Sequence, residues 1–211
     1  MREFLKDGLE PLCYLLYTIA VVLSIKGILS IKKIVLACYY VVAAIVIGVA
    51  CYFSPVHLNH ILYNLFFFAT ISVLSYYFKS LVSTKTKRTL INIIFFINLG
   101  AFAYLSIVTR HLTAINNYYY AITYLSIVVY ALLYFEDLLK NVNELSILHR
   151  FDFWLVAGYL LYFLSCFFII FLYDNFDVEL RANLWTIQNT ILFISTVSTL
   201  LASIWIRQRR Y

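Results

Sequence analysis

Polar side chains that could bind a ligand gather where apolar stretches of this sequence begin and end. Imidazole, amide and guanidinium groups flank these stretches on one predicted side of the chain. Together they predict a small-ligand site at an outer mouth, with ordinary polarity at a membrane surface as the alternative explanation. The residues of this predicted outer mouth are His57, Asn59, His60, Asn64, Arg110, His111 and Asn183.

His57 and His60 are a pair whose spacing a metal site could use. Two residues three apart share a face if their segment is helical, but zinc requires further protein ligands. A third ligand would have to come from another segment, such as Asp174 or Asp177. We therefore expect no metal site and no cofactor.

A second polar set lies inside the apolar stretch at 184–206. Its members follow one another at helical steps of three, four and seven, which places them on one inward face. They could form hydrogen bonds between helices, or they could line a ligand cavity or a movable interface. This intramembrane polar stripe consists of Thr186, Asn189, Thr196, Thr199 and Ser203.

Catalytic patterns are absent from the sequence. It contains no hydrolase, zinc-protease, phosphate-loop or dinucleotide motif. Glu136 and Asp137 are adjacent, and neighbours on a helix point about 100° apart, so we expect solvated charges at a helix end. The segment at 137–150 is predicted to form a short cytoplasmic helix with one apolar face. The sequence indicates that the protein is not an enzyme.

The composition shows what must position these residues. The chain has 211 residues, of which 64% are hydrophobic and 12% are charged. Soluble domains have about 45–50% apolar and about 25% charged residues. These figures exclude a soluble enzyme and a disordered chain, and they favour an integral membrane protein with lipid as its surroundings.

Seven apolar runs predict an all-α fold, a single seven-transmembrane helix bundle over residues 1–211. Each run is close to the length of about 20 residues that a membrane-spanning helix needs. No charged residue lies near the middle of a run, which disfavours a proton pump or an ion-coupled carrier. The runs are 9–25, 34–53, 61–78, 89–108, 118–135, 153–173 and 184–206. Within the second run, Ala44 and Gly48 form a pair of small residues typical of a tight helix contact.

The positive charges predict an orientation. Segments after the first, third, fifth and seventh runs hold twelve Lys and Arg residues, and the other side holds four. Because cytoplasmic segments are enriched in Lys and Arg, the N-terminus is predicted outside and the C-terminus in the cytoplasm. The net charge of +6 is explained in this way without nucleic acid.

Aromatic residues make up 19% of the chain. Several occur as neighbours near the ends of runs, as at 39–40, 76–77 and 118–120. Tyr and Trp concentrate where a membrane meets water. The pattern therefore predicts mainly an interfacial aromatic belt.

Three stretches resemble a group of small bacterial seven-helix membrane proteins that are often encoded beside two-component signalling genes. They read NHILYNLF at 59–66, FWLVAGYLLY at 153–162 and NLWTIQN at 183–189. The group often has a histidine at the position of Gln188 and an acidic residue near Ala69 or Thr70, and this chain departs from it there. The resemblance implies a fold, a location in a bacterial inner membrane and a signalling context, and it implies no particular reaction.

These observations lead to one main functional expectation and two alternatives. We expect a sensory or signalling module that binds something at its outer side and acts through a cytoplasmic partner such as a histidine kinase. A small-solute transporter or channel subunit is one alternative, although the scarcity of Gly and Pro within the runs disfavours it. A structural subunit of a membrane complex is the other, and the oligomeric state stays open.

Overall fold

The computed structural model describes residues 9–25, 31–53, 56–104, 117–140, 147–172 and 176–208, and these ranges fold into helices without a strand. The expected all-α architecture is confirmed for this part of the chain. Every predicted apolar run overlaps one helix. The helices are α1 (Leu9–Leu23), α2 (Ile31–Phe53), α3 (Val56–Leu81), α4 (Lys85–Ala103), α5 (Asn117–Lys140), α6 (Phe151–Phe171) and α7 (Val178–Gln208).

Five helices are long and apolar enough to cross a membrane, namely α2, α3, α5, α6 and α7. Helix α1 is apolar but shorter. Helix α4 carries Lys85, Lys87 and Arg88 in its first turn, which lowers its hydropathy. The five long apolar helices indicate an integral membrane protein, and their outward side chains, such as Ile45, Phe168 and Leu201, are compatible with contact to lipid.

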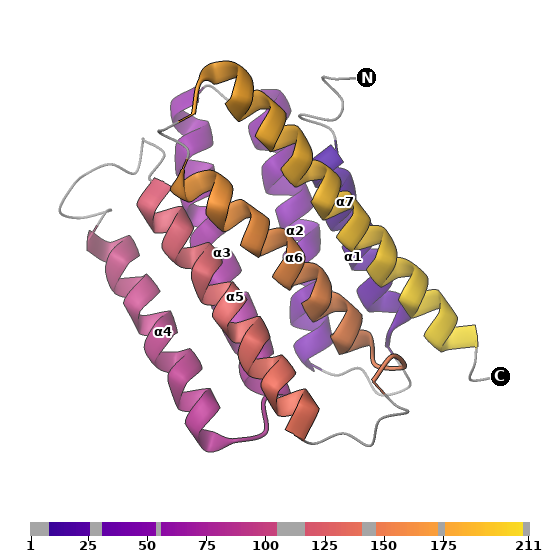
Figure 1. Ribbon diagram of the computed structural model, residues 1–211. Coiled ribbons are helices and arrows are strands. Elements are labelled where there is room, and N and C mark those ends of the chain that lie inside the picture. The colour runs from indigo at the N-terminus through magenta and orange to yellow at the C-terminus, as the bar shows by residue number, and fades with distance from the viewer. Residues whose placement is uncertain are drawn as a thin grey trace.

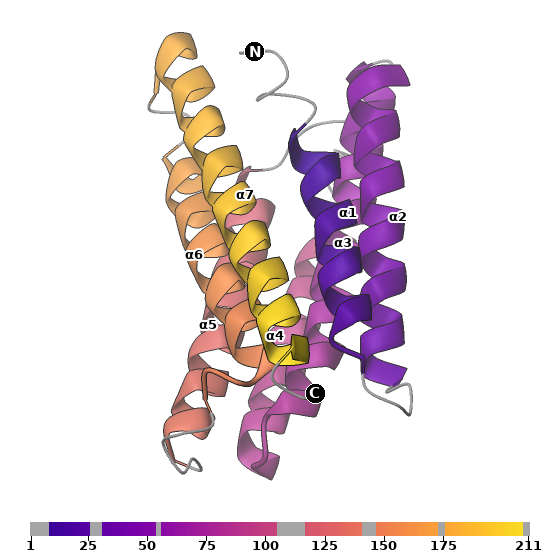
Figure 2. The ribbon, with the colours of Figure 1, turned by 90° about the vertical axis from the view of Figure 1, so that its right-hand side faces the viewer.

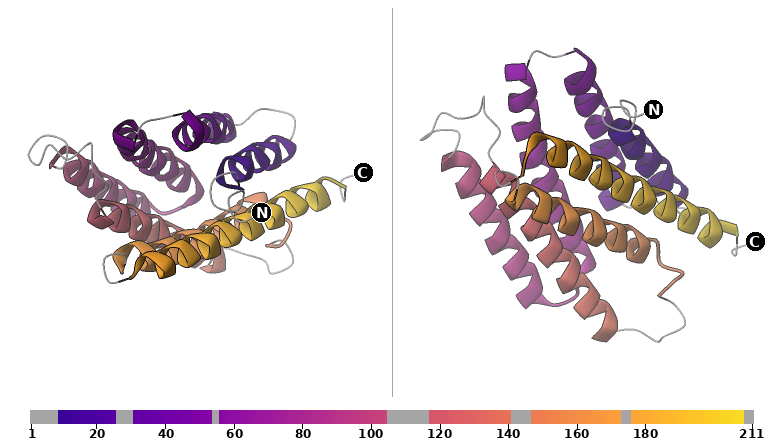
Figure 3. Two further views of the ribbon diagram at one scale, coloured as in Figure 1. Left: turned by 90° about the horizontal axis from the view of Figure 1, so that it is seen from above. Right: turned by 45° about the horizontal axis from the view of Figure 1, so that its top comes forward.

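Six of the helices pack in a closed ring. Around the ring, α1 contacts α2, α2 contacts α3, α3 contacts α5, α5 contacts α6, α6 contacts α7, and α7 returns to α1. Helix α4 lies outside this ring and packs on α3 and α5 (Figure 1). The same arrangement is visible along the bundle, where α4 forms one edge (Figure 3).

The ring is wider at one end than at the other. The pair α1–α2 and the pair α6–α7 move apart from each other toward the end where α1 and α7 begin (Figure 2). Helices α3 and α5 also begin at this end. We call it the entry end, and the opposite end, where these four helices finish, the far end.

Some predicted helix boundaries are wrong at the far end. Helix α5 continues through Asp137 to Lys140, so the residues expected to start a separate helix at 137 belong to α5. Leu138 is buried there, while Leu139 is exposed. Residues 147–150 form a turn before α6, and 141–146 lie outside the described residues, as do 105–108 of the fourth predicted run.

The small-residue pair on α2 forms no tight contact at Gly48. A side-chain carbon built on Gly48 would meet nothing within 4 Å. Ala44 by contrast is buried. The expected close helix contact instead occurs at Gly158 on α6, where a side-chain carbon would come within 3.3 Å of the Ser195 Cβ on α7.

Most of the paired tyrosines point into the bundle. Tyr39, Tyr40 and Tyr77 are buried, whereas Tyr76 and Tyr118 are exposed. An interfacial belt therefore explains only part of the aromatic content. The interior itself is aromatic, and its tyrosine hydroxyls form hydrogen bonds between helices, as between Tyr40 and Tyr159.

Candidate functional site

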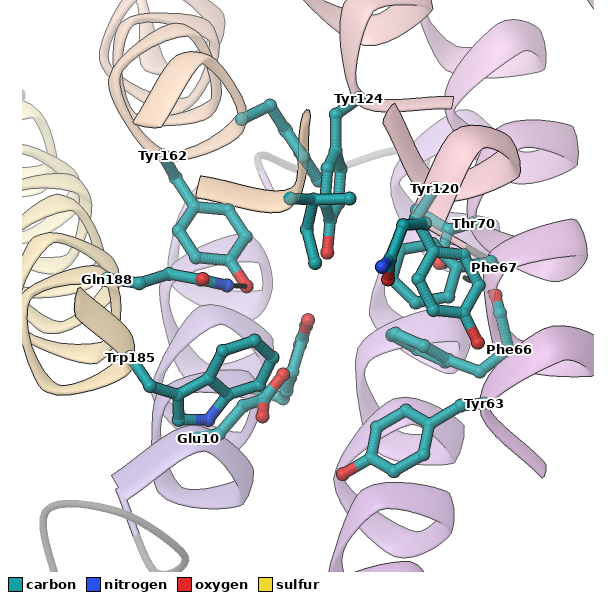
Figure 4. Close-up of a pocket in the computed structure, with 14 residues that line it drawn as sticks. Glu10, Tyr63, Phe66, Phe67, Thr70, Tyr120, Tyr124, Tyr162, Trp185 and Gln188 are labelled. Carbon is teal, nitrogen blue, oxygen red and sulfur yellow. Dashed lines mark hydrogen bonds between the residues drawn. The ribbon is translucent and has the colours of Figure 1, made fainter. Parts of the chain in front are cut away.

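A cavity of about 240 Å³ lies inside the ring near the entry end. It is lined from α1, α3, α5, α6 and α7, so five of the six ring helices contribute to it. The close-up shows the side chains arranged around a shared central space (Figure 4). The lining residues are Glu10, Tyr14, Tyr63, Phe66, Phe67, Thr70, Asn117, Tyr120, Tyr124, Tyr162, Phe163, Ile170, Trp185 and Gln188.

Helical spacing brings these residues onto the inner faces of their helices. Helix α3 contributes four lining residues that are spaced three, one and three positions apart, namely Tyr63, Phe66, Phe67 and Thr70. On α5, Tyr120 and Tyr124 lie one turn apart. Residues three or four apart lie on the same face of a helix, so each helix presents a short aromatic strip to the cavity.

Ring contacts hold the aromatic walls in place. Phe67 stacks on Tyr120 with ring centroids 4.0 Å apart and meets Tyr124 edge-on at 5.3 Å. On the other side of α3, Phe66 packs edge-on against Tyr14 at 5.9 Å. Such contacts join α1, α3 and α5 around the space, so its shape is fixed by packing.

Hydrogen bonds orient two further wall groups. The Tyr120 hydroxyl donates to the Asn64 Oδ1 at 2.9 Å. The Thr70 Oγ1 donates to the Phe66 carbonyl at 2.8 Å and lies 2.8 Å from the Tyr39 hydroxyl. The polar atoms of Tyr120 and Thr70 thus have protein partners, and their apolar surfaces are left facing the cavity.

Two further wall side chains, Gln188 and Glu10, carry acceptor oxygens. Gln188 is only 2% exposed, its Nε2 lies 3.4 Å from the Tyr162 hydroxyl, and its buried Oε1 has no hydrogen-bond partner. Glu10 stands in the first turn of α1 and lines the same space. The ion pairs found within the described ranges do not include Glu10, and no lining residue there is Lys, Arg or His.

The cavity has a rim and a floor. Glu10, Tyr63, Asn117 and Trp185 are partly exposed and lie at the entry end. Below the cavity, toward the far end, a second void of about 10 Å³ lies among further tyrosines. That volume is at the limit for one water molecule, so tyrosine side chains close the cavity from below.

The floor is a stack of rings between helices. Tyr17 on α1 stacks on Tyr40 on α2 with centroids 5.0 Å apart. Tyr40 is hydrogen-bonded to Tyr159 on α6, which also approaches Tyr17 at 6.2 Å. These three tyrosines therefore join α1, α2 and α6 below the cavity.

The predicted outer-mouth residues have mixed positions. Asn64 is buried and supports Tyr120, as described above. His60 is half-buried and Asn183 is exposed, and neither lines the cavity. The side chains of His57 and Asn59, together with Arg110 and His111, lie outside the described residues. The cavity lies near the entry end, but none of its lining residues is one of the predicted outer-mouth residues.

The predicted stripe on α7 faces the bundle interior without reaching the cavity. Asn189, Thr196, Thr199 and Ser203 are buried, and Thr186 is half-buried. The hydroxyls of the three buried Thr and Ser residues donate to carbonyls one turn back on α7. These bonds lie within α7, and one bond between helices joins the Thr199 hydroxyl to the Trp154 carbonyl on α6 at 3.5 Å. The α7 residues that line the cavity are Trp185 and Gln188, which are not part of the predicted stripe.

Other buried polar residues connect helices elsewhere. Asn98 on α4 is fully buried, donates to Ser126 at 2.8 Å and accepts from Thr123 at 3.2 Å. Ser75 on α3 donates to the Tyr130 hydroxyl at 3.1 Å. Both contacts tie α5 to its neighbours and neither touches the cavity.

The far end contains a buried ionic cluster that the sequence did not predict. The Asp137 carboxylate accepts from the Ser83 amide at 2.7 Å, from the Ser83 hydroxyl at 3.0 Å and from the Lys87 ammonium at 3.3 Å. The Asp137 and Lys87 side chains are 8% and 11% exposed. The expectation of solvated charges is therefore wrong for Asp137, and it holds for Glu136, which is 47% exposed.

Sequence reasoning missed most of the cavity because aromatic residues were attributed to the membrane interface. The available signal was the one-turn spacing of Tyr120 and Tyr124 and the position of Gln188 beside the polar stripe. A single acidic residue at the start of α1, Glu10, was a further signal. Comparison with protein-family models, with curated proteins and with solved structures finds no match to this chain.

Proposed function

We propose that this protein is a sensory membrane module that binds a small ligand in the aromatic cavity and signals through a cytoplasmic partner. The observation that carries the proposal is the cavity itself, which is enclosed by five helices and closed from below by tyrosines. A receptor site needs a shaped space that is open on one side, and largely apolar walls with a few polar groups are typical of such sites.

The helices that line the cavity also offer a route for a signal. Helix α3 carries Phe66 and Phe67 at the cavity, and its last turn leads into Ser83. Helix α5 carries Tyr120 and Tyr124 at the cavity and Asp137 near its other end. A shift of α3 along α5 on ligand binding would therefore change the contact between Ser83 and Asp137 at the far end.

Such a shift requires that the ligand bind one arrangement of the helices better than another. The cavity satisfies this requirement in principle, because its walls come from separate helices whose spacing sets its volume. We propose that the far end, with the segments around Lys79–Arg88 and Glu136–Asp152, is the surface for the partner. This assignment rests on the sequence-based orientation with seven spans, the N-terminus outside and a bacterial inner membrane.

The charge distribution supports that orientation. Among the described residues, Lys33, Lys79, Lys85 and Arg150 lie at the far end, whereas Arg181 lies at the entry end. Lys and Arg residues mark the cytoplasmic side of membrane proteins. The cavity would then open to the outside, where an environmental ligand arrives.

The proposal is tested by filling the cavity in the living cell. Ile170→Phe adds volume at a lining residue, and Leu164→Phe makes the same kind of addition at an exposed position of α6 that does not line the cavity. We expect the transcriptome of the Ile170→Phe strain to match that of a deletion strain, while Leu164→Phe matches the wild type. Affinity purification from wild-type membranes should recover a signalling protein.

Two results would refute the sensory function. One is a deletion strain with unchanged transcription whose affinity-purified protein brings down no signalling partner. The other is an Ile170→Phe protein that folds, is inserted in the membrane and behaves as wild type. Thermal unfolding of the purified variants shows whether both are folded.

A small-solute carrier is the second candidate. The observation that favours it is that the cavity and the smaller void below share Tyr14, Tyr162 and Phe163, so the two spaces are adjacent. Movement of the tyrosine floor would join them. Uptake of a cavity ligand into proteoliposomes, absent with Ile170→Phe, would favour the carrier over the sensor.

A further inference from the structure

We propose that the ligand of the aromatic cavity is a small organic ammonium ion that carries at least one N–H group and an apolar body. This inference rests on the proposed ligand-binding function and names the chemical class of ligand. It is drawn from three features of the wall: the density of aromatic faces, the two acceptor side chains Gln188 and Glu10, and the volume.

The first feature is the aromatic wall. Nine of the fourteen lining residues are Tyr, Phe or Trp. The faces of these rings carry partial negative charge and attract a cation within about 6 Å of the ring centroid. Aromatic cages of this kind are the usual protein environment for organic ammonium ions. A neutral apolar ligand would gain from the same rings, so the polar groups must decide between the two.

The second feature is the pair of acceptors. The Oε1 of Gln188 is buried without a hydrogen-bond partner, and leaving such a group unpaired is unfavourable. A ligand N–H group that reaches it would remove this cost. The Glu10 carboxylate lines the same space from α1, and both side chains extend toward its centre in the close-up (Figure 4).

No basic side chain among the described lining residues would neutralise Glu10 in place of a ligand. An anionic ligand would face a carboxylate, an amide oxygen and the negative faces of the rings. Such a ligand is therefore disfavoured by the wall. A cation with N–H donors satisfies the amide oxygen and the carboxylate and also binds to the rings.

The third feature is the size of the space. A cavity of about 150 Å³ lined by apolar side chains is able to hold benzene. The present cavity, at about 240 Å³, therefore has room for an aromatic ring with a short aminoalkyl chain. This size matches an amine such as 2-phenylethylammonium, which we take as the probe.

The test compares three probes that share one body and differ in charge: 2-phenylethylammonium, 2-phenylethanol and 3-phenylpropionate. Binding is measured by titration calorimetry at neutral pH on the full chain in lipid nanodiscs. The Ile170→Phe protein in the same nanodiscs measures how much of the heat signal comes from probe that partitions into the lipid and does not bind in the cavity. We expect the ammonium ion to bind at least about tenfold more tightly than the alcohol, and the carboxylate to bind most weakly.

Variants locate the effect at Glu10. Glu10→Gln should reduce ammonium binding to about the level of the alcohol and leave the alcohol unchanged. Glu179→Gln is the matched control, because Glu179 also lies in the first turn of its helix but is exposed and does not line the cavity. It should bind all three probes as the wild type does.

The outcomes separate this inference from the proposed function. The ammonium assignment would be overturned if the alcohol or the carboxylate bound as tightly as the ammonium ion or more tightly. If that binding were lost in Ile170→Phe, the cavity would still be a ligand-binding site. Ammonium binding that is insensitive to Glu10→Gln would also overturn it. If none of the probes binds, the ammonium assignment fails, and the transcriptome of the Ile170→Phe strain decides the sensory function independently.

Discussion

Three donor groups converge on the Asp137 carboxylate, two from Ser83 and one from Lys87. The adjacent Glu136 contacts Lys87 and Lys140 from the outside of the bundle. Glu136 and Asp137 are therefore neighbours in the sequence and carry the same charge, but their surroundings differ. Removal of one partner from a buried ion pair leaves the other charge buried without an opposite charge, which is strongly destabilising. An exposed ion pair contributes little to the free energy of unfolding.

This contrast gives a prediction at the residue scale. We expect Asp137→Ala to lower the free energy of unfolding by about 3 kcal/mol, and Glu136→Ala to have a much smaller effect. Reversible denaturant unfolding in detergent micelles measures both. Equal effects of the two substitutions would contradict the buried contacts of Asp137 with Ser83 and Lys87.

The two buried amides provide a second prediction at this scale. Asn98 has its side-chain nitrogen and oxygen bonded to α5, whereas the oxygen of Gln188 has no partner. In the ligand-free protein, Gln188→Leu should raise the free energy of unfolding by about 1 kcal/mol, because an unsatisfied buried acceptor is removed. Asn98→Leu should lower it, because Thr123 loses its acceptor.

Gln188→Leu should at the same time weaken binding of 2-phenylethylammonium. A gain in stability combined with a loss of binding is typical of a residue kept for function. A loss of stability in Gln188→Leu would instead indicate that the amide has a structural partner, and it would remove one of the two acceptors from the ligand site.

At the scale of the helices, α6 and α7 approach one another closely at Gly158. A side-chain carbon there would lie 3.3 Å from the Ser195 Cβ and 3.4 Å from the Tyr17 hydroxyl. Gly48 on α2 has open space around the same position. The two glycines are therefore a matched pair for testing helix packing.

We expect Gly158→Val to destabilise the protein by about 1–3 kcal/mol through overpacking between α6 and α7. Gly48→Val should be neutral or slightly stabilising, since Val restricts the unfolded chain more than Gly does. The shift in the thermal unfolding midpoint of each variant is the measurement. Destabilisation by Gly48→Val alone would place the tight contact on α2, as the Ala44 and Gly48 spacing predicted.

The sequence predicted the helices better than their faces. Each of the seven apolar runs overlaps one described helix, and five of these helices are long and apolar enough to cross a membrane. The uniformly apolar character of these runs hides which face is inward, so Tyr39, Tyr40 and Tyr77 were assigned to the membrane surface. Periodicity was informative only where polar residues interrupted the run, as on α7, where Thr196 and Thr199 face inward.

The position of Asp137 shows a second limit of sequence reasoning. Its burial depends on Ser83 and Lys87, which approach it only because α3, α4 and α5 pack together. A local pattern around residue 137 contains no information about that packing. For the same reason, Glu10 and Gln188 could be noticed in the sequence, but it could not be predicted that both line one cavity.

At the scale of the whole molecule, the proposed topology makes a prediction that does not depend on the cavity. A fusion of green fluorescent protein to the C-terminus should be fluorescent, and a fusion of alkaline phosphatase there should be inactive, because only the first folds in the cytoplasm. With the same two proteins fused to the N-terminus, we expect the opposite result: active phosphatase and no fluorescence. An active C-terminal phosphatase would contradict the orientation and place the far end outside.

Photolabelling shows whether a small ammonium ion binds in the cavity that five of the six ring helices line. An aryl-azide derivative of 2-phenylethylammonium is bound to the protein in nanodiscs and irradiated, and the labelled residues are identified by mass spectrometry. We expect labels on cavity residues, such as Tyr120, Tyr124 and Trp185, that disappear with an excess of the unlabelled amine. Labels confined to lipid-facing residues such as Phe168 or Leu201, or labelling that the unlabelled amine does not reduce, would contradict the account.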